Sequence, residues 1–276
     1  MVRLSRTIRF CINPSERHPT DTPRNGFGGK PPMEGLGRYY EITIDAVGEP
    51  DPQTGYLVNI KVLDQAVRNG LIPLIERACR SHPDKNPVEL MPELLAAISG
   101  ELREASAQAL TLRLTPYHSI QMTARNPTTA LIRQQFDFAA AHRLHVPELS
   151  AQENRAIFGH CNNLAGHGHN YRFEPCVAVS LNTGKPDFTL GKLEQLAHEV
   201  ILSRFDHKHL NHDTQEFGPS GVIPSVENIA KVFFDLMAPA VRDASSGKAQ
   251  LHAMTVWETD RTSCTYPADN PTTTSQ

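Results

Sequence analysis

The stretch from Phe158 to Tyr171, FGHCNNLAGHGHNY, constrains this chain more than any other. His167 and His169 stand two residues apart, and the run that follows, YRFEPCVAVSL, is rich in apolar and β-branched residues and predicts a strand. Side chains at positions i and i+2 of a strand point to the same face, so the two imidazoles can bind one ion. Catalytic zinc typically takes three protein ligands, and a third ligand must therefore come from another segment.

Residues 136–144, FDFAAAHRL, offer that third ligand. Phe136, Phe138, Ala140 and His142 alternate onto one face, so His142 ends the apolar face of a predicted strand. Two strands of one sheet can then bring His142 next to His167 and His169. Imidazole suits Zn²⁺, and the absence of an accompanying carboxylate cluster disfavours calcium and magnesium.

Two further segments contain groups suited to proton transfer and ligand binding. In FDHKHLNHD, Asp206 stands beside His207, and a carboxylate–imidazole pair can hold one tautomer and supply a proton. Glu258 follows Trp257 in a predicted strand, where a carboxylate can accept hydrogen bonds from an amino-substituted heterocycle. Each feature alone has a plainer interpretation, and Cys161 alone is more often a small buried residue than a base. Their occurrence together in one domain-length segment favours a functional site.

The segment from Phe136 to Tyr266 resembles the family of 6-pyruvoyl tetrahydropterin synthase and 6-carboxytetrahydropterin synthase. The blocks AAAHRL, FGHCNNLAGHGHNY, DHKHLN, PSVENIA and VWET occur in the family's order. The resemblance implies the following roles: zinc on His142, His167 and His169; Cys161 as proton acceptor, with Asp206 and His207 as its partners; Glu258 as the anchor of the pterin ring; and Ser225 and Glu227 in the lining of the pterin pocket. One departure is His160, because the family commonly has lysine there, and this weakens a predicted contact to triphosphate.

The resemblance implies a carbon–oxygen lyase that converts 7,8-dihydroneopterin triphosphate to 6-pyruvoyl tetrahydropterin with loss of triphosphate. The spacing from Cys161 to His167 resembles that of the pyruvoyl-forming enzymes and favours this product. The alternative is a 6-carboxy-5,6,7,8-tetrahydropterin synthase of the queuosine and deazapurine pathway, which also releases acetaldehyde. An alternative of another class is a non-catalytic pterin-binding module, for which we expect a missing base or an incomplete zinc triad.

Composition excludes several other functions. A formal net charge of −3 argues against a nucleic-acid-binding protein, which usually has a basic surplus. No stretch approaches the ~20 apolar residues that span a membrane, and the N-terminus has no apolar core of signal-peptide length. Five cysteines, an odd and sparse set, do not indicate a disulfide framework. We therefore expect a cytoplasmic enzyme whose Cys161 remains a thiol.

Both halves of the chain predict the order ββααββ, which indicates an α+β fold of tandem modules. The predicted division, near residues 124–130, gives a degenerate N-terminal copy in residues 1–125 and a zinc-binding catalytic copy in residues 130–270. GLGRYY, residues 35–40, lies where GHGHNY lies in the second half, so Leu36 and Arg38 replace the two histidines. Similarity of architecture alone, without duplication, is the alternative.

The resemblance also implies the tunnelling fold. Each copy then forms a four-stranded antiparallel sheet with two helices on one face, and unpaired edge strands favour assembly. We expect a homo-oligomer whose copies close a barrel. Residues 14–37 are dense in proline and glycine and predict a long loop.

Local pattern predicts several other elements. Residues 38–48, RYYEITIDAVG, alternate and predict a strand. Residues 60–79 predict a helix that is weakened or kinked around Gly70 and Pro73, and residues 91–107 predict a second helix. In the second half we expect a loop between FDFAAAHRL and the strand that begins at His167, and a helix over SVENIAKVFFDLMAPAV with Ser225 as its N-cap.

Overall fold

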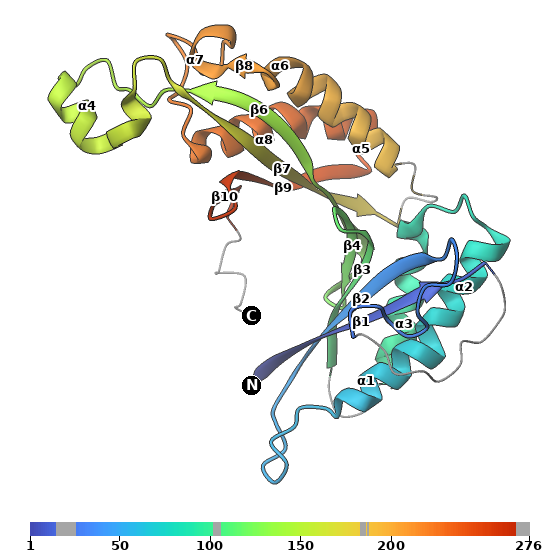
Figure 1. Ribbon diagram of the computed structural model, residues 1–276. Coiled ribbons are helices and arrows are strands. Elements are labelled where there is room, and N and C mark those ends of the chain that lie inside the picture. Colours follow the sequence, from blue (N-terminus) through green and yellow to red (C-terminus); the bar gives the residue numbers. More distant parts are fainter. Residues whose placement is uncertain (15–25, 102–105, 183–185, 187, 269–276) are drawn as a thin grey trace. The chain divides into compact units, whose positions relative to one another are not determined.

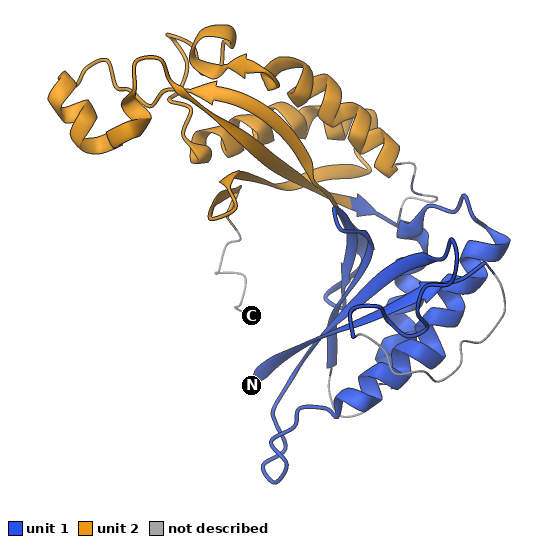
Figure 2. Ribbon diagram, in the orientation of Figure 1, with its two compact units in different colours: residues 1–132, 179–186 blue, residues 133–178, 187–276 orange. Residues whose placement is uncertain are grey.

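The structure is a computed structural model that describes residues 1–14, 26–101, 106–182, 186 and 188–268. The chain divides into two compact units (Figure 2). Unit 1 comprises residues 1–132 and 179–186, and unit 2 comprises residues 133–178 and 187–276. The chain therefore passes from one unit to the other after residues 132, 178 and 186. Residues 15–25 of the predicted loop at 14–37 lie outside the described residues.

Unit 1 is built on antiparallel strands in the order β1-β2-β3-β4. The sequence RYYEITIDAVG alternates apolar and polar residues, and Ile42, Ile44 and Ala46 are accordingly fully buried. The helices cover one face of these strands (Figure 1). The elements of this half of the chain are β1 (Val2–Ile12), β2 (Arg38–Gly48), α1 (Ile60–Ala66), the π-helix η1 (Val67–Leu71), α2 (Ile72–Ser81), the 3₁₀ helix η2 (Pro87–Leu90), α3 (Met91–Glu101), β3 (Ser106–Thr115), β4 (His118–Thr123) and β5 (Asn126–Gln134).

Unit 2 has β7 at its centre, with β6 and β9 as neighbours, β10 on β9, and the short β8 on β6. Aromatic side chains of β6 and β7 pack against Phe233 of α8, with ring centroids 5.4 Å from Phe138 and 5.6 Å from Phe173. The elements are β6 (Phe136–His142), α4 (Ala151–Phe158), the 3₁₀ helix η3 (Gly159–Asn162), β7 (His167–Ser180), α5 (Leu190–Ala197), the π-helix η4 (His198–Leu202), α6 (Ser203–Phe205), β8 (Lys208–His209), α7 (Leu210–Asp213), α8 (Val226–Ala244), β9 (Ala249–Thr259) and β10 (Thr262–Tyr266).

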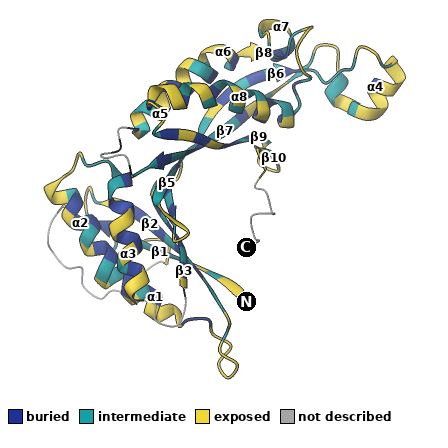
Figure 3. Cartoon of the chain, turned by 180° about the vertical axis from the view of Figure 1, so that it is seen from behind, coloured by how far each residue is buried: buried dark blue, intermediate teal, exposed yellow. Residues whose placement is uncertain are grey.

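In each unit the buried residues gather where strands and helices meet, and the outer helix faces are exposed (Figure 3). Helix α8 shows the sequence basis of this arrangement. Ser225 caps its N-terminus, as predicted, by accepting a hydrogen bond from the Asn228 amide at 3.4 Å. Its fully buried Ile229, Phe233 and Met237 recur at helical spacing and face the sheet.

Four details differ from the predictions. Residues 126–134, near the predicted division, form the strand β5, because Ala130 and Ile132 are buried in alternation. The helix predicted to reach residue 107 gives way to β3 by Ser106. The segment predicted as a loop before β7 contains α4. Strand β8 runs parallel to β6, so the strands of unit 2 are not wholly antiparallel, and the strands of both units belong to one ten-stranded sheet instead of two separate sheets.

The break predicted in the first helix is present as a π-helical segment. Gly70 lies inside η1, and Pro73 occupies one of the first positions of α2, where its missing amide hydrogen costs no helical bond. Unit 2 has the same interruption, η4, after α5. None of the described helices is long and apolar enough to cross a membrane.

Candidate active site

Three histidines converge at the end of β6 and the beginning of β7. In the antiparallel register His142 pairs with His167, and Ala140 pairs with His169, so the three side chains share one face. One nitrogen from each ring lies within 4.8 Å of the others. The Nε2 atoms of His142 and His167 are 3.0 Å apart. Zinc with Zn–N bonds near 2.1 Å requires nitrogens about 3.4 Å apart, so small ring rotations suffice to ligate one ion.

The ring of the fully buried His142 is held in place by a hydrogen bond at Nδ1, the nitrogen that does not face His167. Nδ1 lies 2.7 Å from the carbonyl oxygen of Pro224, which can only accept, so Nδ1 donates and Nε2 is left unprotonated. The hydroxyl of Tyr171 lies 3.2 Å from the same nitrogen. Burial lowers the pKa of His142 to about 4, and burial also lowers the pKa of His167. Both rings are therefore neutral at pH 7, as metal ligation requires.

The donor set fits a metal ion on a second ground. Nε2 of His169 is buried and has no hydrogen-bond partner among the described residues. Such orphaned buried atoms are uncommon and call for an explanation. Glu258 of β9 adds a carboxylate oxygen 3.5 Å from Nε2 of His142 and 3.8 Å from Nε2 of His169. A cation among these atoms satisfies the His169 nitrogen and balances the carboxylate charge.

Cys161 lies in η3 and opens onto a cavity of about 930 Å³ that it shares with His167. The backbone beside the thiol is tied to the strand that ends in His142. The Leu144 amide donates to the Cys161 carbonyl at 2.9 Å, and the Asn162 side chain donates to the Leu144 carbonyl at 2.7 Å. The thiol and one metal ligand therefore face the same space.

Asp206 and His207 form the predicted pair, with 2.9 Å between Oδ1 and Nδ1. Burial acts to raise the pKa of Asp206, but hydrogen bonds from the Ala139 amide and from His207 outweigh it and hold the pKa below its usual value. His207 has a positive φ of 56° and a side chain that is 81% exposed. The structure thus presents an imidazole to solvent, held in place by a charged carboxylate.

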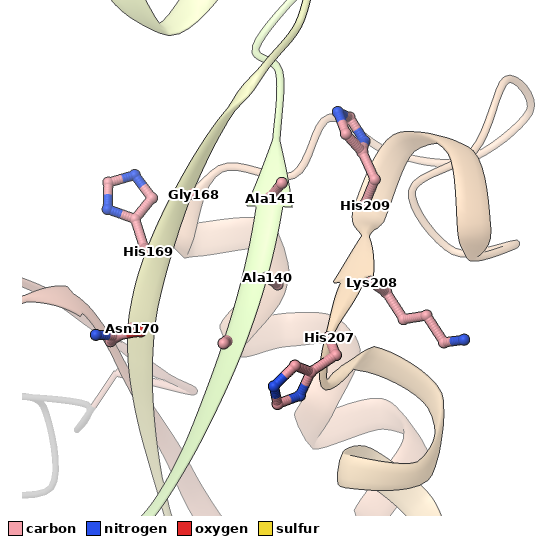
Figure 4. Close-up of a pocket in the computed structure, with 9 residues that line it drawn as sticks. Ala140, Ala141, Gly168, His169, Asn170, His207, Lys208 and His209 are labelled. Carbon is pink, nitrogen blue, oxygen red and sulfur yellow. The ribbon is translucent and has the colours of Figure 1, made fainter.

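His207 and Cys161 lie at different cavities of the chain. His207, which directly precedes β8, lines a cavity with His169 of β7, and both β8 and β7 pair with β6 (Figure 4). Neither Asp206 nor His207 is among the described residues that line the Cys161 cavity. Each of the two cavities contains one metal-ligand candidate, His169 in the first and His167 in the second.

The remaining predicted residues have structural roles of their own. The hydroxyl of Ser225 is engaged as the cap of α8, and Glu227 lies in the first turn of that helix. Burial, followed by the charge of Glu227, raises the pKa of Cys264 on β10. Glu258, predicted as a pterin anchor, stands beside the histidines instead of apart from them.

Several site residues escaped the sequence analysis. The Pro224 carbonyl and Gly166 carry no side-chain signal, whereas Tyr171 lies two residues beyond His169 and so faces the same side of β7. Gly166 has a φ of +71°, and an added Cβ would lie 2.7 Å from Nε2 of His209 and 2.9 Å from the carbonyl oxygen of His142. Only glycine fits this position without strain.

Comparison with known proteins matches this half of the chain. The family model for 6-pyruvoyl tetrahydropterin synthase matches residues 131–269. The 6-pyruvoyl tetrahydrobiopterin synthase of Poecilia reticulata is 37% identical over 131 residues, which cover 47% of this chain and 84% of the relative. The Homo sapiens enzyme of the same name is 30% identical over 148 residues, which cover 51% of this chain and 92% of the relative. The solved 6-pyruvoyl tetrahydropterin synthase of Caenorhabditis elegans aligns with a TM-score of 0.45 at 32% identity, covering 50% of this chain and 94% of that one.

Proposed function

This chain belongs to the 6-pyruvoyl tetrahydropterin synthase family, and we propose that unit 2 is a zinc-dependent enzyme with the activity of that family. Its members are lyases that make 6-pyruvoyl tetrahydropterin from dihydroneopterin triphosphate. The observation that supports it best is the convergence of three imidazoles at the end of β6 and the beginning of β7, where Nε2 of His169 is buried and has no hydrogen-bond partner among the described residues. Imidazole ligands favour zinc over the hard cations.

His142, His167 and His169 would hold the zinc ion, which when bound polarises the substrate's side-chain hydroxyls and acidifies the neighbouring C–H bonds. Cys161 would accept a proton from the side chain in the cavity that it shares with His167. Asp206 would keep His207 oriented for proton exchange at its exposed ring. Glu258 would accept hydrogen bonds from the pterin and so fix the distance from the ring to the reacting carbons.

Analysis of the products formed from 7,8-dihydroneopterin triphosphate tests this proposal. We expect triphosphate and 6-pyruvoyl tetrahydropterin in equal amounts, with about one zinc ion per chain. Acetaldehyde together with a 6-carboxypterin would instead assign the chain to the carboxy-forming branch. Binding of the substrate without release of triphosphate would support a pterin-binding module.

We further propose that unit 1 is a duplicated copy that has lost the metal site. Phe10 pairs with Tyr40 between β1 and β2, as Phe138 pairs with Tyr171 between β6 and β7. Tyr40 and Tyr171 are separated by the same number of residues as Val67 and His198, the first residues of η1 and η4. A shared aromatic pair and a shared π-helical interruption at one offset support descent from a common module.

The histidine positions have no counterpart in unit 1. The residue that pairs with Ile12 is Arg38, in the place of His169, and the ladder ends there. Counting two residues further along each segment would put Pro14 and Leu36 in the places of His142 and His167. The edge strands β1 and β10 also suggest assembly into a homo-oligomer, as the resemblance implies. Measurement of the mass in solution by light scattering tests this, and a monomer at working concentration would contradict it.

A further inference from the structure

The cavity that contains Cys161 has a permanent positive charge and no negative one. Its lining is Arg155, Gly159, His160, Cys161, Asn162, Asn163, Leu164 and His167. None of these described residues is acidic, and the exposed Arg155 has no ion-pair partner among the described residues. A guanidinium that lines the same cavity as a thiol and a candidate metal ligand suits an anionic ligand.

Helix α4 fixes Arg155 in this position. Ser150 and Glu153 form a capping box, so the Glu153 carboxylate is engaged at the helix N-terminus and its pKa is lowered by its hydrogen bonds with Ser150. Asn154 is fully buried, and its side chain donates to the carbonyl oxygens of Val146 and Leu149 at 2.9 and 3.0 Å. The two residues before Arg155 are therefore engaged in other hydrogen bonds, and the Glu153 carboxylate is held at the helix N-terminus instead of pairing with Arg155.

We propose that Arg155 binds the triphosphate of the substrate and is a specificity-determining residue of this site, an inference that rests on the function proposed above. The reaction removes a proton from one carbon of a three-carbon side chain and breaks the C–O bond to triphosphate on the adjacent carbon. The proton passes to sulfur, a C=C bond forms, and the C–O electron pair leaves with the triphosphate oxygen. The leaving group is thus a few bonds from the thiol, in the cavity that Arg155 lines.

The other cavity offers a matched alternative. Lys208 is the one permanently charged residue among the described residues that line the cavity of His169 and His207 (Figure 4). Its lining contains no thiol, so a triphosphate bound there would lie apart from Cys161. Substitution of Lys208 therefore distinguishes the two locations, and Arg242, an exposed arginine at the end of α8, serves as a control for charge alone.

The test measures KM for 7,8-dihydroneopterin triphosphate and inhibition by inorganic tripolyphosphate and by unphosphorylated neopterin. We expect Arg155→Gln to raise KM and the tripolyphosphate inhibition constant by about 10-fold or more, since a hydrogen-bonded charge pair is lost. Inhibition by neopterin should be unchanged, and Arg155→Lys should recover part of the loss. The wild-type inhibition constant for tripolyphosphate should rise with salt, less steeply in Arg155→Gln.

Unchanged tripolyphosphate inhibition in Arg155→Gln, or a rise in Lys208→Gln alone, would overturn the inference while leaving the lyase activity in place. An equal effect in Arg242→Gln would also overturn it, because the effect would then follow net charge. If the wild-type chain fails to turn over the substrate, the proposed function fails. Binding of tripolyphosphate measured by calorimetry, lost in Arg155→Gln, would even then establish the anion site.

Discussion

Units 1 and 2 contain a similar aromatic pair between neighbouring strands and differ at the histidines, which only unit 2 has beside that pair. Each pairs an aromatic residue with a tyrosine across its first two strands, with ring centroids 5.7 Å apart for Phe10 and Tyr40 and 4.9 Å apart for Phe138 and Tyr171. The tyrosine hydroxyls have different partners. Tyr171 reaches a metal-ligand histidine, whereas Tyr40 lies 3.5 Å from the sulfur of Cys79. The aromatic pair therefore does not depend on the histidines beside it in unit 2.

The contrast also appears in exposure. Under the proposed duplication Leu36 corresponds to His167, and its side chain is 92% exposed in the turn before β2. Burial, together with the hydrogen bond to Cys79, raises the pKa of Tyr40 to about 12, and its hydroxyl stays protonated. The aromatic pair of unit 1 is therefore buried without any histidines beside it, which is what the proposed duplication requires.

The largest expected effect is loss of the ion itself. His167→Ala should reduce zinc from about one ion per chain to nearly none and lower turnover by more than about 100-fold, since removing a ligand costs at least as much as removing an outer partner. Leu36→Ala, the counterpart in unit 1, should change neither. Metal analysis and turnover measured on the same preparations check this. Two ions in the wild-type chain would mean that unit 1 also binds metal.

A thiol in each unit allows a second comparison. Cys161→Ala should lower turnover by roughly 10²–10⁴-fold, the usual contribution of a positioned acid or base, while zinc is retained. Cys79→Ala should leave turnover unchanged. Full activity in Cys161→Ala, measured as triphosphate release, would assign the base to another residue.

The two cores should be comparably costly to disrupt. Phe10 is 0% exposed and Phe138 is 3% exposed, so truncation of either to alanine should lower the free energy of unfolding by about 3–5 kcal/mol. Urea denaturation followed by circular dichroism measures both. A much smaller loss for Phe10→Ala would show that unit 1 is held together less tightly than unit 2.

Acid should destabilise the metal-free protein through His142. Its pKa is about 4 in the folded chain and about 6.5 when unfolded, so the unfolded chain binds more protons between these values. The contribution is complete above pH 6.5 and declines as the pH falls toward 4, by about 3 kcal/mol in all. Unfolding measured across this range checks the slope, which should be shallower in His142→Asn. Pro14, at the corresponding position of unit 1, has no side chain that titrates.

The smallest effect concerns the two helix caps. Asn59 caps α1 through the Lys61 amide, and Thr189 caps α5 through the Lys192 amide. Each change to alanine should cost about 1 kcal/mol. Equal losses of stability in thermal unfolding would show that the two units also resemble each other in these caps. A loss confined to Thr189→Ala would show that the cap of α1 contributes less than the cap of α5.

The sequence predicted the features that depend on local pattern. Alternation predicted β2 from Arg38 to Gly48, and the His-Gly-His spacing predicted two side chains on one face of β7. Helix α4 was missed because it is short and buries only Asn154, although Ser150 and Glu153 gave the signature of a capping box. The caps of longer, more amphipathic helices such as α8 were easier to identify.

Features that depend on long-range packing could not be predicted. The Pro224 carbonyl reaches His142 from 82 residues away, and a backbone group leaves no trace in a sequence pattern. The approach of Glu258 to His142 and His169 depends on β9 lying beside β7, which no local pattern specifies. The separation of Cys161 from Asp206 and His207 into two cavities likewise emerges only from the folded chain.

The three passages of the chain between units have a practical consequence for dissecting this protein. Residues 179–186 belong to unit 1, although they follow the metal-binding half of β7 in sequence, and the Leu181 amide donates to the Thr128 carbonyl at 2.8 Å. No single truncation point therefore separates the units. A gene fragment that begins near residue 130 would encode all three histidines of the candidate metal site. It would also encode the eight residues 179–186 without the part of unit 1 in which they pack.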